Sequence, residues 1–153
     1  MTRRCADERG ATAVLIAFIM VGLLAFGGLV IDGGDAFAQR RQMQNAADAS
    51  ATAGANALYL AKRATSPGPA SDIQVKALEA AVANGAKAGT FTCLLVHLTG
   101  PDTSCASATA SNIDDVFKVR VIVDSDHSTQ LIRVVGIKSF NADGAAAASL
   151  RAG

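Results

Sequence analysis

The 153-residue sequence contains no tryptophan, two histidines and three cysteines, and aromatic residues make up only 5% of it. It holds no HExxH, phosphate-loop or G-x-S-x-G motif, and neither histidine lies in a recognisable triad context. The cysteines have no spacing typical of a zinc or redox site. We therefore expect a protein with no catalytic activity, no bound metal and no cofactor.

An excess of charge is also missing. The chain has 14 Lys+Arg against 13 Asp+Glu, and beyond residue 31 we count eleven of each. A surface that binds nucleic acid needs concentrated basic charge, so we do not expect nucleic acid as a partner. Half of the residues are hydrophobic, but many are alanines, which bury little area each. The folded part should therefore be small.

The most prominent feature present is an uncharged run from Ala11 to Ile31. A run of this length can cross a bilayer as a helix, because each residue adds about 1.5 Å and the hydrocarbon is about 30 Å thick. We predict a transmembrane helix over residues 11–31, preceded by a short basic leader over residues 1–10. Membrane lipid is then one expected partner.

The charges beside this run predict its orientation. Three arginines precede it, whereas Asp32 and Asp35 follow it before the next basic pair, Arg40 and Arg41. Cytoplasmic flanks carry the excess of Lys and Arg. We expect a single-pass protein of a bacterial cell membrane, with its N-terminus in the cytoplasm and its C-terminal domain outside.

Two forms of processing compete with a permanent anchor. Ala36-Phe37-Ala38 fits the small-x-small pattern of a secretory cleavage site, although the apolar run is longer than a usual signal sequence. The second candidate site lies between Gly10 and Ala11. A short charged leader ending in glycine before an apolar helix is typical of prepilins, and cleavage there would leave the span on the mature protein.

We predict an alanine-rich stalk helix over residues 32–63. A bend is expected at Gly33 and Gly34, where the chain leaves the membrane. Alanines recur at every fourth position in two parallel rows. They are either simply good helix formers or a packing seam, since rows of small residues let another helix or a sheet approach closely. The seam consists of Ala49, Ala53, Ala57 and Ala61, and the parallel row of Ala47, Ala51 and Ala55.

Residues 64–153 predict a small α+β domain, in which a loop over 65–70 leads into a second helix. This helix should run from Ser71 or Asp72 to about Lys87, with Gly89 ending it. Its apolar face would comprise Ile73, Ala77, Leu78, Ala81 and Val82.

β-like segments follow at 90–98 and 115–124, and 129–135 is a short apolar segment that could be helix or strand. Residues 138–150 start as a strand and end in an alanine-rich tail. The fold class is therefore α+β: a long N-terminal transmembrane and stalk helix, followed by a small antiparallel sheet with one or two helices, as in pilins.

Cys93 and Cys105 both lie in the predicted exterior domain, twelve positions apart across a turn-like segment. They are well placed to form a disulfide in an oxidising compartment, and the alternative is two unrelated buried thiols. The acidic segment from Asp124 to His127 predicts a solvated turn rather than a metal site. His97 lies in an apolar β-like run, which favours a packed or edge position.

Polar landmarks beside the span carry a family resemblance. Arg9-Gly10 precedes the span, Asp32 follows it, and Arg40-Arg41 leads into the stretch from Gln44 to Ala49, QNAADA. From Glu8 to about Leu58 the chain resembles the N-terminal module of TadE/TadG-like proteins of Flp (tight-adherence) pilus systems. The resemblance covers about a third of the sequence and includes polar as well as apolar positions.

This resemblance implies a non-enzymatic, membrane-anchored pilus-assembly component or minor pilin-like protein. Its partners would be other pilus subunits, held through helix packing, and a homo-oligomer is one form of this assembly. Pilins and TadE-type proteins carry a glutamate five residues after the cleavage glycine, where this chain has Leu15. That difference favours the TadG-like branch, which stays in the membrane.

Two alternatives remain. The chain could be a filament subunit that is processed after Gly10, or a membrane-tethered binding module of the envelope that recognises a ligand through its Cys93–Cys105 loop.

Overall fold

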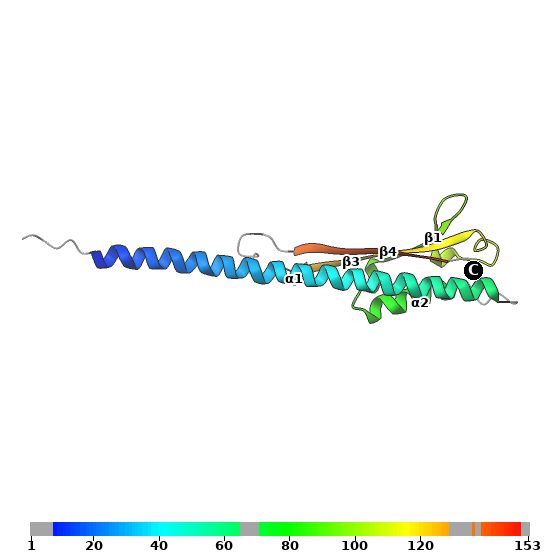
Figure 1. The fold of residues 1–153 in the computed structure, drawn as a ribbon, viewed down its shortest axis with the longest axis horizontal. Coiled ribbons are helices and arrows are strands. Elements are labelled where there is room, and N and C mark those ends of the chain that lie inside the picture. Colours follow the sequence, from blue (N-terminus) through cyan, green and yellow to red (C-terminus); the bar gives the residue numbers. More distant parts are fainter. Residues whose placement is uncertain (1–7, 65–70, 129–135, 137–138, 151–153) are drawn as a thin grey trace, which may run out of the picture.

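The computed structural model describes residues 8–64, 71–128, 136 and 139–150. A long helix is followed by a shorter helix and a four-stranded antiparallel sheet (Figure 1), which confirms the predicted α+β class. The elements are α1 (Glu8–Arg63), α2 (Ser71–Ala83), η1 (Ala88–Thr90), β1 (Phe91–His97), β2 (Thr103–Ser104), η2 (Cys105–Ser107), β3 (Val116–Ser128) and β4 (Ser139–Ser149). The predictions for the leader over 1–7, the loop over 65–70 and the segment 129–135 lie outside the described residues.

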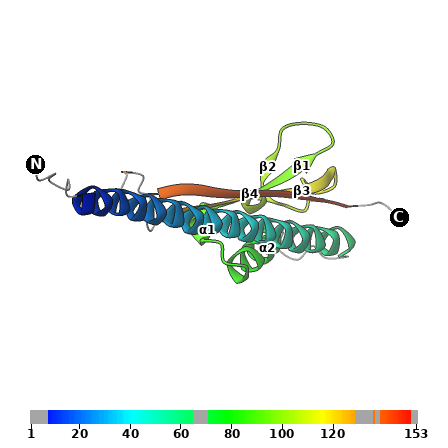
Figure 2. The same ribbon diagram turned by 60° about the vertical axis from the view of Figure 1, so that its left-hand side comes forward.

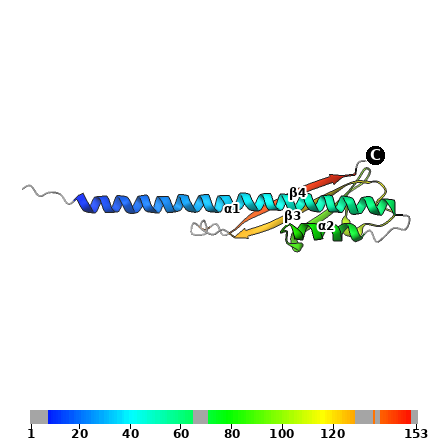
Figure 3. The same cartoon turned by 60° about the horizontal axis from the view of Figure 1, so that its bottom comes forward.

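Helix α1 is a single helix of 56 residues that joins the predicted span to the predicted stalk. It runs without a break in all three ribbon views (Figures 1, 2 and 3). The bend predicted at Gly33 and Gly34 is therefore wrong. Each glycine costs about 1 kcal/mol relative to alanine in a helix, but good helix formers on both sides propagate the hydrogen-bonded ladder through them.

The sheet has the strand order β2-β1-β3-β4, and every neighbouring pair is antiparallel. Strand β3 continues beyond its predicted end at Asp124, because Ser125 pairs with Ala142 and Ser128 with Ser139. The turn predicted for Asp124–His127 is therefore wrong. The predicted alanine-rich tail is also strand, since residues 139–149 pair with β3 throughout.

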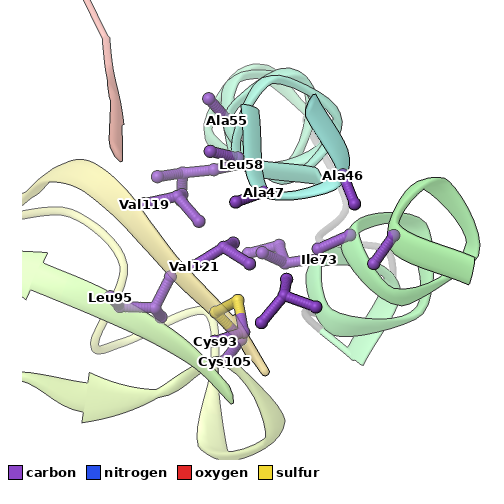
Figure 4. Packing of buried hydrophobic residues seen from close by; sticks show 14 of the residues in the cluster. Ala46, Ala47, Ala55, Leu58, Ile73, Cys93, Leu95, Cys105, Val119 and Val121 are labelled. Atoms are coloured by element: carbon purple, nitrogen blue, oxygen red, sulfur yellow. A yellow bond between two sulfur atoms is a disulfide. The ribbon is translucent and has the colours of Figure 1, made fainter. Parts of the chain in front are cut away.

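The core lies between one face of the sheet and the C-terminal half of α1, with α2 packed beside α1 (Figures 3 and 4). Alternate β3 residues Val119, Val121 and Val123 are fully buried, whereas Arg120 lies exposed on the other face. Leu58 of α1 and Ile73 of α2 complete the centre of the core. We call this unit, comprising the C-terminal half of α1, α2 and the sheet, the sheet domain.

Helix α2 ends earlier than predicted. The amide of Ala86 donates to the carbonyl of Ala81, and the amide of Gly85 donates to that of Val82. This pair of bonds, with Gly85 at φ +91°, is the Schellman motif that stops a helix. Gly85 therefore ends α2, in place of Gly89.

The predicted apolar face of α2 is buried only in part. Ile73, Ala77 and Ala81 are fully buried and Leu78 is half-buried, but Val82 is exposed. Val82 lies at the C-terminal end of α2, just before the chain turns at Gly85.

Candidate functional site

The N-terminal half of α1 is an exposed apolar surface. Among the described residues, one helix is long and apolar enough to cross a membrane. Only 6% of the residues in its most apolar stretch are buried. Phe18, Leu24 and Val30 are each more than 70% exposed. A helix that is apolar on all sides suits a lipid environment, so this half of α1 is a candidate membrane span. Both Ala11 and Ile31, the predicted span ends, lie within the helix.

Small residues in the C-terminal half of α1 allow this helix to pack closely against β3 and α2. A Cβ atom at Gly54 would lie 3.0 Å from Val119 Cγ1 of β3 and 3.4 Å from Ala77 Cβ of α2. Nearby, Ser50 Oγ donates a buried hydrogen bond to the carbonyl of Ala77 at 2.5 Å. The two helices and the sheet therefore meet at close range along this part of α1.

The two alanine rows have different surroundings. Ala47, Ala51 and Ala55 are buried in the core. The predicted seam residues Ala49, Ala53, Ala57 and Ala61 are half-buried at the edge of the core. The row nearer the sheet is thus already used within the chain, and the seam row keeps part of its surface open.

Three seam residues line a groove of about 420 Å³ between α1 and α2. Ala53, Ala57 and Ala61 form one side of it, together with Leu60, which is 59% exposed, and Ile73 of α2 contributes to the other. Ala49 is not among its lining residues. The groove is completed by Asn56, Ala64, Asp72 and Lys76.

The groove has an apolar floor and a polar rim on α2. Lys76 forms an exposed ion pair with Glu79 at 2.9 Å, and the hydrogen bond from Lys76 to Glu79 raises the pKa of the lysine. Such a groove favours an apolar partner with polar flanks.

A second cluster fixes the loop between β1 and β3. Cys93 and Cys105 form a disulfide with their Cα atoms 5.4 Å apart, which fits the predicted pairing, and both residues are buried. Arg120 of β3 pairs with Asp102 of the loop at 3.2 Å. The loop is therefore held to the sheet by a covalent and an ionic link.

His97 lies in the same region, at the end of β1. Its Nδ1 is 2.6 Å from Asp115 Oδ1 and its Nε2 is 2.8 Å from Thr103 Oγ1. The hydrogen bond with His97 lowers the pKa of Asp115. The packed position predicted for His97 agrees with a side chain that is only 6% exposed. Its two polar partners come from outside β1, Thr103 from β2 and Asp115 from the turn before β3, so the local pattern of β1 could not predict them.

An acid, an imidazole and a hydroxyl in hydrogen-bonded series resemble a catalytic relay. Here, however, the imidazole is enclosed, and each of its nitrogens is held by a side chain of the fold. The cluster connects the end of β1, β2 and the start of β3, so its evident effect is to fix the loop. Within the described part of the chain, no group of three metal-ligating side chains is present.

Comparison with protein families gives a match along α1. Residues 10–57 match the family model of TadE/G-like Flp pilus-assembly proteins. The match covers the apolar half of α1 and extends along its packed half to Ala57, and it confirms the resemblance of the N-terminal module. Searches of curated proteins and of solved structures gave no match.

Proposed function

We propose that this chain is a non-enzymatic, single-span structural component of a Flp-type pilus assembly apparatus, which stays anchored in the cell membrane. The family match over residues 10–57 supports a pilus-related and structural role. The observation that carries the proposal is α1 itself, whose exposed apolar half continues without a bend into the core of a folded domain.

In this proposal α1 works as a rigid stalk. Its N-terminus lies in the cytoplasm, residues 11–31 cross the bilayer, and the sheet domain lies outside. Leu15 is 61% exposed on the apolar half. A glutamate at this position would need a partner inside the membrane, because an unpaired carboxylate is costly there. Leu15 needs none and suits permanent contact with lipid.

The intact mass of the protein, extracted from its native membrane, tests the anchor. We expect a chain that begins at Met1 and remains in the membrane fraction after an alkaline carbonate wash. A chain that begins at Ala11 would favour the filament subunit processed after Gly10. A chain that begins at Gln39 would contradict both readings, because the span would have been removed.

We further propose that the groove between α1 and α2 receives a helix of a neighbouring pilus subunit. Ala53, Ala57 and Ala61 allow a second helix backbone to come close. Leu60, which is exposed at the edge of the groove, gives this helix an apolar contact. Packing of helices against each other, rather than catalysis, would then be the mechanism of assembly.

Replacing Ala57 with leucine should fill part of this groove and reduce co-purification of neighbouring subunits at least tenfold. A partner helix held away by about 1 Å loses up to about half of the dispersion attraction of each contact, summed over the whole groove. Ala83→Leu adds the same side chain at an exposed position of α2 outside the groove, and it should leave the complex intact. Crosslinking and co-purification from the membrane measure the result.

Because leucine at position 57 could also disturb folding, Leu60→Ser provides a second variant. It removes an exposed apolar side chain of the groove and adds no bulk. If Leu60→Ser and Ala57→Leu both keep wild-type thermal unfolding and wild-type complexes, the groove is not an assembly surface.

A further inference from the structure

We propose that the sheet domain rests directly on the bilayer and contacts lipid headgroups through its end nearest the span. This base surface consists of Phe37 and Arg40 of α1 and residues Asn141–Asp143 at the start of β4. The inference relies on the proposed function in one respect, namely that residues 11–31 lie in the membrane.

The position of the base surface follows from the helix. Gly33, Ala36, Phe37 and Arg40 of α1 line a hollow of about 280 Å³ together with residues 141–143 of β4. At about 1.5 Å per residue, Gly33 lies about 3 Å beyond Ile31 and Arg40 about 14 Å beyond it. The headgroup layer adds about 5–7 Å to each side of the hydrocarbon. The start of β4 is therefore level with the headgroups or just above them.

The shape of α1 leaves no spacer between the span and the domain. The helix continues unbroken through Gly33 and Gly34, so no hinge raises or tilts the domain away from the membrane. The long strands β3 and β4 lie along the same helix (Figures 1 and 2). The distance between the domain and the bilayer is thus fixed by the helix geometry.

Burial along α1 agrees with this position. Asp32 is only 4% exposed, Gly28 is also buried, and Ala36 is half-buried on the same face. A bare stalk would be exposed on all sides after Ile31. One face of α1 is instead buried around the end of the predicted span, as expected if the domain begins close to the membrane surface.

The chemistry of the base surface suits an interface. Phe37 is 74% exposed although it lies beyond the apolar run, and aromatic side chains are favoured at the boundary between lipid and water. Arg40 is exposed one helical turn further, and a guanidinium binds phosphate through a planar set of donors. Asn141 and Asp143 are exposed beside them. Apolar and charged groups together fit headgroups better than hydrocarbon.

If the sheet domain rests on the bilayer, the distance between the groove and the membrane is also fixed. Ala57 lies 26 residues beyond Ile31, which corresponds to about 39 Å above the hydrocarbon. A partner helix in the groove would have to reach this level. The groove thus fits a subunit with a long stalk of its own.

Variants with a single tryptophan test this arrangement by fluorescence. The chain has no tryptophan of its own, so no other tryptophan contributes to the emission. The full-length variants Phe18→Trp, Phe37→Trp, Asn141→Trp and Leu98→Trp are reconstituted in phosphatidylcholine–phosphatidylglycerol vesicles. Quenching is measured with brominated acyl chains and with nitroxide-labelled headgroups. Leu98, which is 71% exposed, follows β1 at the end of the sheet far from the base surface and is the control.

We expect acyl-chain bromines to quench Phe18→Trp at least twofold, and headgroup nitroxides to do the same to Phe37→Trp and Asn141→Trp. Leu98→Trp should respond to neither. If Phe18→Trp is quenched but Asn141→Trp is not, the domain stands away from the bilayer, and the inference fails while the anchor stands. Blue-shifted Asn141→Trp emission without quenching would place a second copy of the chain there and overturn the inference equally.

Two other outcomes are distinct from these. Quenching of Leu98→Trp by headgroup nitroxides would mean that the domain lies flat on the membrane, which contradicts the upright position. Absence of acyl-chain quenching in Phe18→Trp would show that α1 is not in the bilayer, and the proposed function itself would fail.

Discussion

Gly144→Ala should destabilise the sheet domain by about 3 kcal/mol, at the upper end of the usual cost of overpacking. A Cβ atom at this position of β4 would lie 2.3 Å from the carbonyl oxygen of Met43 and 2.7 Å from the amide nitrogen of Gln44. These are backbone atoms of α1, which cannot turn aside as the end of a side chain can. The helix and the strand would have to separate, and the buried side chain of Met43 would lose contacts.

Thermal unfolding of the full chain in detergent measures this effect, and two variants serve as controls. Gly89→Ala meets no atom within 4 Å, and Ala147→Val lies on the exposed face of β4. Both should change stability by less than about 0.5 kcal/mol, as exposed substitutions usually do. Wild-type unfolding of Gly144→Ala would show that α1 and β4 are further apart than described.

Removal of the disulfide should have an effect of similar size. The double variant Cys93→Ala, Cys105→Ala should lose about 3 kcal/mol, since the bridge closes a loop of about twelve residues in the unfolded chain. The loop should remain near β1, because the contacts of His97 with Asp115 and Thr103 do not depend on the bridge. Denaturant unfolding with and without reductant provides the measurement.

Cys5→Ala is the matched control for the disulfide, because Cys5 lies at the other end of the chain, before the predicted span. It should leave the unfolding midpoint unchanged, and reductant should shift that midpoint as it does in the wild type. The proposal that the bridge stabilises the domain would be abandoned if reductant had no effect on wild-type unfolding.

The sequence predicted the features that depend on neighbouring residues. The uncharged run from Ala11 to Ile31 predicts an apolar helix long enough to be a candidate span, because length and lack of charge can be read directly from the sequence. The segment 115–124 was recognised as β-like because valine and other β-branched or aromatic residues, which favour strands, predominate in it. The polar landmarks around the span were sufficient to identify the family of the N-terminal module.

Other predictions failed where tertiary contacts decide. Asp124–His127 looked like a turn, and the alanine-rich end of residues 138–150 looked like a tail, because aspartate and alanine have low strand propensity. Pairing between β3 and β4 overrides that preference, and small residues in β4 are what allow α1 to approach. Gly33 and Gly34 likewise remain helical, because the good helix formers on both sides propagate the hydrogen-bonded ladder through them.

By itself the sequence determined that an apolar helix is followed by an alanine-rich one, and that a small α+β domain with a suitably spaced cysteine pair comes after them. Only the tertiary structure decided which alanine row enters the core and which one lines a groove, since both rows have the same composition and period. It also decided that Gly144 must lack a side chain and that Gly33, Ala36, Phe37 and Arg40 of α1 lie beside residues 141–143. These properties depend on distances between segments far apart in the chain, and no local pattern records such distances.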